Sequence, residues 1–161
     1  MTDLHLTPRT PVDLLGHLPA GQRALYRLET AIAESALPKA TYELIKIRAS
    51  QINGCAFCLD MHHHDAVDLG ETAERLAVLP AWRESELFTH EERVALALTE
   101  AVTEIADGHP SPELEAEARA TFDEETYAAV VFAIVAINSW NRLAIVGHKV
   151  PGSMRQEAAA S

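Results

Sequence analysis

Helical periodicity is the feature that most constrains the fold of this chain. No segment alternates apolar and polar residues for long enough to make a convincing β-strand. Between Thr89 and Gly108, by contrast, apolar residues recur at the spacing of one helix face. They are Val94, Leu98, Ala101, Val102 and Ile105. Thr89 and Glu92 form a capping-box pair at the start of this stripe. The pattern predicts an all-α fold.

The same reasoning divides the rest of the chain into about six to seven helices. We expect them at about 21–36, 38–53, 55–69, 71–79, 89–108, from 111–112 onwards, and at about 124–146. We expect Pro80 to stop the fourth of them and Asp123 to cap the last. Residues 1–19 read as an irregular arm, with Leu14, Leu15 and Leu18 available to pack onto the core. We therefore expect one domain over 1–161, with its core at about 20–147.

Charge and hydropathy narrow the range of partners and compartments. The formal net charge of −11 argues against a nucleic-acid backbone or an anionic membrane surface as the partner. The longest apolar run, 127–137, is about eleven residues and falls short of the roughly 20 that span a bilayer. The first 16 residues do not resemble a secretory signal peptide. We therefore expect a cytoplasmic protein, in which paired cysteines are more often catalytic or metal-binding than structural.

The two cysteines of the chain, Cys55 and Cys58, stand three residues apart after a helix stop at Asn53-Gly54. Unpaired N–H groups and the dipole at a helix start favour a thiolate, so we expect a lowered cysteine pKa there. His62 lies one turn after Cys58 on the same helix face and could take a thiol proton. The pattern predicts a nucleophile, a base and a second thiol that can close a disulfide.

Other interpretations of this stretch remain open. A C-x-x-C pair can be half of a zinc site, but four ligands are then needed and His62 is the only obvious further one. Two buried cysteines can also act as small hydrophobic side chains. His63 and His64 point to other sides of the helix than His62. We expect His63 to be solvated and His64 to pack or cap locally, and we expect no bound metal or cofactor.

These residues, with their flanks, resemble the AhpD-like alkylhydroperoxidases of the carboxymuconolactone decarboxylase superfamily. Glu43, then eleven residues, then Cys55, Cys58 and His62 reproduce the spacing of that group. The flanking stretches 48–55, 60–62, 81–89 and 137–142 are also similar, so the resemblance covers about residues 43–145. It implies a helical subunit in a homotrimer or homohexamer and thiol-dependent reduction of hydroperoxides.

The resemblance also implies a role for each site residue. Cys58 matches the cysteine that attacks the peroxide, Cys55 the resolving cysteine, His62 the proton acceptor and Glu43 the group that orients it. The electron donor would be an external thiol of the dihydrolipoamide or thioredoxin type. Some members of the group carry a second histidine between the cysteines, where this chain has Phe57. Phe57 cannot relay a proton, and it would line an apolar access route or simply pack.

The sequence favours a peroxidase over two alternatives. One is a non-redox enzyme of the carboxymuconolactone decarboxylase type, against which the Cys55–Cys58 pair counts. The other is a redox sensor that forms its disulfide once and does not turn over. The sequence does not identify the peroxide or the electron donor. Trp140 and Arg142 are plausible residues of a subunit interface, but Trp140 could equally be a core residue and Arg142 a solvated one.

Overall fold

Helices make up all the regular secondary structure of the residues that this computed structural model describes, 10–153. The all-α prediction is therefore confirmed. The elements are α1 (Leu14–His17), α2 (Pro19–Ala33), α3 (Lys39–Asn53), α4 (Ala56–Asp68), α5 (Ala73–Val78), the 3-10 helix η1 (Leu79–Glu84), α6 (His90–Thr103), α7 (Pro112–Thr121) and α8 (Glu124–Val146).

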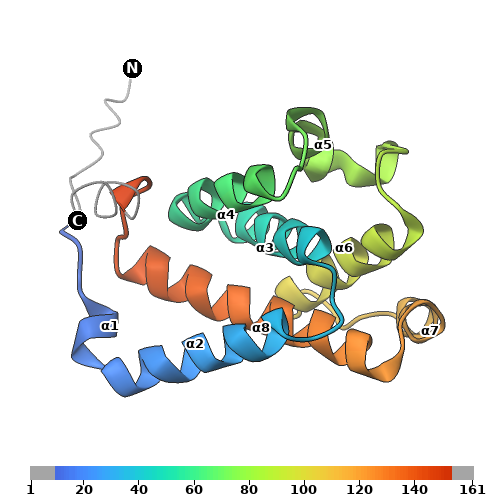
Figure 1. Ribbon diagram of the computed structural model, residues 1–161. Coiled ribbons are helices and arrows are strands. Elements are labelled where there is room, and N and C mark those ends of the chain that lie inside the picture. The colour runs from blue at the N-terminus through green and yellow to red at the C-terminus, as the bar shows by residue number, and fades with distance from the viewer. Residues whose placement is uncertain (1–9, 154–161) are drawn as a thin grey trace.

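Two helices organise the packing, α3 and α8. α3 packs against α4, α6 and α8, while α8 also contacts α2 along the lower side of the molecule in Figure 1. α7 lies at the far end, against α6 and α8. The site residues predicted from the sequence lie on α3 and α4, so the contact between these two helices positions the candidate site.

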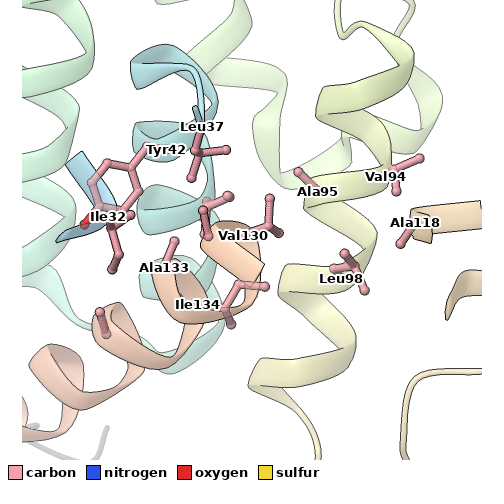
Figure 2. Packing of buried hydrophobic residues seen from close by; sticks show 13 residues of the cluster. Ile32, Leu37, Tyr42, Val94, Ala95, Leu98, Ala118, Val130, Ala133 and Ile134 are labelled. Carbon is pink, nitrogen blue, oxygen red and sulfur yellow. The ribbon is translucent and has the colours of Figure 1, made fainter. Parts of the chain in front are cut away.

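The main core lies where α8 meets α3 and α6. Figure 2 shows Val130, Ala133 and Ile134 of α8 between Tyr42 of α3 and Leu98 of α6. Val130, Ala133 and Ile134 are fully buried. Their burial explains the apolar character of this face of α8, whereas the apolar side chains of Phe132 and Val135 are exposed.

α8 is also long enough to span a bilayer, which the shorter apolar run in the sequence is not. Its most apolar window has a mean hydropathy of 1.7, but half of that window is buried inside the domain. Helix length alone therefore does not show whether α8 spans a membrane or lies in the core, and its packing must be considered. Its contacts with α2, α3, α6 and α7 mark it as a core helix.

The prediction that residues 1–19 form an irregular arm is partly wrong. Its residues 1–9 lie outside the described part of the chain, but Leu14–His17 forms the short helix α1, capped by the Asp13 side chain on the Gly16 N–H. Four residues are too few to show helical periodicity in a sequence. Leu14 and Leu15 are half-buried as expected, whereas Leu18 is exposed.

Two helices also have boundaries that differ from the prediction. α2 covers 19–33 rather than 21–36. α5 ends at Val78, before Pro80, as expected, and Pro80 then occupies the first turn of η1, where its missing N–H costs nothing. α6 ends at Thr103 rather than at Gly108, and Ile105 is exposed beyond it. The Asp123 cap and the bounds of α8 are confirmed.

Val130 provides a test of this core. Val130→Ala removes fully buried methyl groups, and we expect it to lower the free energy of unfolding by about 2 kcal/mol. Val67→Ala is the matched control, because Val67 is 45% exposed on α4, and its effect should stay within about 0.5 kcal/mol. Urea unfolding followed by circular dichroism measures both. Equal losses in the two variants would contradict the assignment of the core.

Candidate active site

The turn between α3 and α4 carries Cys55, and Cys58 lies in the first turn of α4. Gly54 ends α3 in the left-handed conformation, at a φ of 68° that glycine adopts without strain. The N–H of Cys55 then donates to the carbonyl of Ser50, and Cys55 becomes the N-cap of α4. The sequence placed Cys55 inside the helix, but it lies one residue before it. The helix stop at Asn53-Gly54 is as expected.

Cys55 and Cys58 are joined as a disulfide, with their Cα atoms 5.4 Å apart. The N–H of Cys58 donates to the sulfur of Cys55 at 3.3 Å, so a backbone N–H of the first turn of α4 hydrogen-bonds this sulfur directly. Both residues are only 1% exposed. After reduction, the free N–H groups and the dipole of α4 would favour a thiolate at this position.

His62 and Glu43 meet across the contact between α4 and α3. Nδ1 of His62 lies 2.9 Å from Oε2 of Glu43, and both side chains are buried. In the sequence only the family resemblance pointed to Glu43, and the structure brings its carboxylate to the imidazole. With Nδ1 held by a carboxylate, Nε2 is the nitrogen of His62 left to exchange a proton with a substrate or a thiol.

Two more charged groups complete this cluster. Nζ of Lys46, also buried, lies 2.9 Å from the other oxygen of Glu43. The carboxylate of Asp65, half of it in solvent, approaches Nδ1 of His62 at 3.5 Å. Glu43 thus stands between a histidine and a lysine, which accounts for a carboxylate being buried there.

Each pKa in the cluster reflects a balance of opposing effects. Burial tends to lower the pKa of His62, but contacts with the carboxylates of Asp65 and Glu43 raise it overall. Burial tends to raise the pKa of Glu43, but His62 and Lys46 lower it overall. The pair therefore favours an ionised Glu43 and strengthens His62 as a base.

Glu43→Gln tests this coupling. We expect the pKa of His62 to fall, because burial and Lys46, which both lower it, remain while an anion is removed. In the wild type the pKa lies above 6.5, so the neutral base form appears only at higher pH; in the variant it should appear at lower pH. An NMR titration of the His62 ring measures the shift. Glu34→Gln, on the exposed end of α2, should leave it unchanged, and an unchanged pKa in Glu43→Gln would refute the coupling.

A pocket of about 410 Å³ reaches Cys58 and His62. Its lining is mainly apolar and comes from the N-terminal segment, α2, α4, α8 and the segment after α8. The lining residues are Val12, Leu14, Leu15, Gln22, Tyr26, Glu29, Phe57, Cys58, Met61, His62, Trp140, Leu143, Ala144, Lys149 and Ser153. Cys55 lines a separate pocket of about 270 Å³ with His148. Both cysteines, although buried, therefore border cavities.

The neighbouring residues bear out part of the sequence interpretation. Phe57 lines both pockets and also packs against the cluster around the cysteines, so its two expected roles are both visible. His63 is exposed, as expected. His64 is also largely exposed, with Nε2 3.8 Å from a carboxylate oxygen of Asp60.

Glu43, His62 and Asp65 also offer ligand atoms within 4.8 Å of one another, close enough to bind a metal ion. This grouping contains neither cysteine, so it is not the zinc site that the C-x-x-C pair suggested. The Lys46 ammonium on Glu43 already supplies a cation to it.

Side-chain amides that are buried or half-buried hold α8 against α3, the helix that precedes the cysteines. Nδ2 of Asn53 donates to the side-chain oxygens of Asn138 and Asn141, each at 2.9 Å. Nδ2 of Asn141 donates to the hydroxyl of Ser50, whose carbonyl in turn receives the Cys55 N–H. The stretch 137–142, which drew attention in the sequence, thus supports the turn that carries the site.

Sequence reasoning did not find Lys46, Asp65 or Glu29 as members of the site. Lys46 follows Glu43 at the i, i+3 spacing of an ion pair, which is a detectable but common signal. Glu29 lies on a different helix, and no spacing links it to the motif. Trp140, considered as an interface or core residue, lies half-buried in the pocket wall and packs against the cluster around the cysteines.

The fold and the dithiol site define a small helical protein with a redox-capable cysteine pair, and comparison with known proteins identifies its family. Residues 19–101 match the carboxymuconolactone decarboxylase family. The chain is 44% identical over 127 residues to the uncharacterized protein YdfG of Bacillus subtilis, which covers 79% of this chain and 86% of that protein. This chain therefore belongs to the carboxymuconolactone decarboxylase family, and its solved relatives place it in the AhpD-like group.

One of these structures is a protein of unknown function from Agrobacterium tumefaciens, described provisionally as the antioxidant defence protein AhpD. It is 35% identical, with a TM-score of 0.84, over 89% of this chain and 98% of that one. The debrominase Bmp8, solved with 2,3,4-tribromopyrrole, has a TM-score of 0.77 over 91% of this chain and 78% of its own. At 19% identity it shows a shared fold alone.

Proposed function

We propose that this protein is a thiol-dependent peroxidase that works through Cys58, Cys55, His62 and Glu43. The supporting observation is that Cys58 and His62 line one pocket while Glu43 holds Nδ1 of the imidazole. This arrangement joins a nucleophile, a base and an orienting carboxylate in the manner of a catalytic triad.

The proposed reduction of a hydroperoxide has three steps. His62 takes the proton of Cys58, and the thiolate attacks the terminal oxygen of a hydroperoxide; the O–O bond breaks, and the alkoxide leaves as an alcohol after receiving that proton. Cys58 is now a sulfenic acid. The thiol of Cys55 displaces water from it and closes the disulfide. Two thiol groups of an external donor then exchange with the disulfide, restore both cysteines and leave as the donor's own disulfide.

A steady-state assay tests this function. The reduced protein is mixed with cumene hydroperoxide and either dihydrolipoamide or reduced thioredoxin, and peroxide loss is followed. We expect many turnovers per chain with at least one donor. A single turnover with every donor would instead indicate a redox sensor. Activity on a ring lactone that survives alkylation of the cysteines would indicate the decarboxylase type.

We also propose that the protein is cytoplasmic and works as a homotrimer or homohexamer. Phe132 and Val135 of α8 are 54% and 46% exposed, and they lie three residues apart on one helix face. Two exposed apolar side chains on a helix whose other face packs into the core fit a contact between subunits. Light scattering on the purified protein measures the assembly, and a monomer at micromolar concentration would contradict it.

A further inference from the structure

One wall of the larger pocket is an aromatic pair joining two helices. The ring of Trp140, on α8, packs at a tilt against the ring of Tyr26, on α2, with their centroids 5.3 Å apart. Both residues line the pocket that reaches Cys58. A wall of this kind offers broad apolar surface to whatever binds beside the cysteine.

Glu29 fixes the orientation of this wall. The indole Nε1 of Trp140 donates to Oε1 of Glu29 at 2.9 Å. The hydroxyl of Tyr42 donates to the other carboxylate oxygen, and the ammonium of Lys46 lies 3.9 Å from that same oxygen. Both oxygens of Glu29 thus already have partners. Its carboxylate serves as an anchor for Trp140 rather than as a group that receives a ligand.

The pocket is far larger than the smallest peroxide needs. Its volume is about 410 Å³, whereas a water molecule occupies about 30 Å³ in the liquid. Hydrogen peroxide has only two oxygen atoms and would touch little of the apolar wall. A hydroperoxide with an aryl or branched alkyl group would cover that wall while its O–O bond lies beside Cys58. Burial of such a group is worth about 10- to 100-fold in affinity.

We propose that Trp140, held in place by Glu29, is a specificity-determining residue. It selects hydroperoxides that carry an aryl or branched alkyl group over hydrogen peroxide. The selectivity in turnover rests on the proposed peroxidase function. The binding preference of the pocket does not rest on it and can be measured separately.

The kinetic arm compares kcat/KM for cumene hydroperoxide with kcat/KM for hydrogen peroxide. We expect a wild-type ratio of about 10 to 100. In Trp140→Ala the ratio should fall about tenfold, mainly through KM for cumene hydroperoxide, because the wall is lost. Trp140→Phe, which keeps an aromatic face, should retain more of the ratio than Trp140→Ala. Glu29→Gln should lower the ratio, whereas Glu34→Gln, on the exposed end of the same helix, should not.

The binding arm needs no turnover. The oxidised protein is titrated with 2-phenyl-2-propanol, the alcohol that cumene hydroperoxide would leave, and binding is followed by NMR. We expect saturable binding with shifts of the Trp140 indole N–H, and a Kd about tenfold weaker in Glu29→Gln than in Glu34→Gln.

The outcomes distinguish the specificity role of Trp140 from the peroxidase function itself. Equal kcat/KM for both peroxides, or equal losses for both in Trp140→Ala, overturns the specificity role and leaves the peroxidase standing. Absence of turnover with every peroxide overturns the peroxidase. The alcohol titration then decides the pocket's preference: binding that Glu29→Gln weakens supports it, and absence of binding overturns it.

Discussion

Cys58→Ser is expected to abolish peroxide turnover, leaving less than about one thousandth of the wild-type rate. Serine keeps the size of the side chain but cannot form a thiolate or a sulfenic acid at neutral pH. Cys58 lines the pocket together with His62, and the other sulfur in that lining is the thioether of Met61, so no other thiol of the lining can take its place. Peroxide consumption under saturating thiol donor measures the effect.

Cys55→Ser is the control for this result. It leaves the attacking thiolate, so a first equivalent of peroxide should still be consumed and a sulfenic acid should form at Cys58. Further turnover should slow, because the resolving thiol is missing. Equal steady-state rates for wild type and Cys58→Ser would end the peroxidase interpretation. A first equivalent lost in Cys58→Ser but kept in Cys55→Ser would support the order of the two cysteines.

His62→Gln is expected to lower kcat/KM for peroxide by about 100- to 10,000-fold at neutral pH, the usual contribution of a positioned acid–base group. Glutamine can still hydrogen-bond Glu43, which limits the damage to the buried cluster. The remaining rate should rise with pH, because hydroxide then replaces the lost base. A rate profile from about pH 6 to pH 9 measures both effects.

His63→Gln is the matched control, since His63 is the next residue of α4 but is exposed to solvent. We expect its rate and pH profile to match the wild type. A similar loss in both histidine variants would show that the effect comes from the helix rather than from a base at His62.

The sequence predicted the helical class and the local arrangement around the cysteines because both depend on short-range rules. The helix stop at Asn53-Gly54 follows from residues within one turn, and so does the start of the next helix at the cysteines, although Cys55 is its N-cap rather than its first residue. The spacing of Cys58 and His62 likewise fixes a shared helix face. Helix boundaries that depend on tertiary packing were harder to predict from the sequence. α6, for example, ends before Ile105, which is exposed.

The pocket could not be read from the sequence in the same way. Its wall combines Tyr26 and Glu29 of α2 with Trp140 of α8, more than a hundred residues further along the chain. Nothing in the spacing of these residues indicates that they meet. Glu43 reached the candidate site only through the family resemblance, because a mid-helix glutamate is ordinarily solvated. The Lys46 contact explains how it tolerates burial.

The stoichiometry of the first oxidation tests whether Cys55 and Cys58 together reduce one hydroperoxide per chain. Fully reduced protein, without any donor, is mixed with increasing cumene hydroperoxide, and remaining thiols, intact mass and cumyl alcohol are measured together. We expect one alcohol formed per chain, loss of both thiols, and a mass lower by two hydrogen atoms as Cys55 and Cys58 join. Peroxide left unconsumed while both thiols remain free would contradict this expectation.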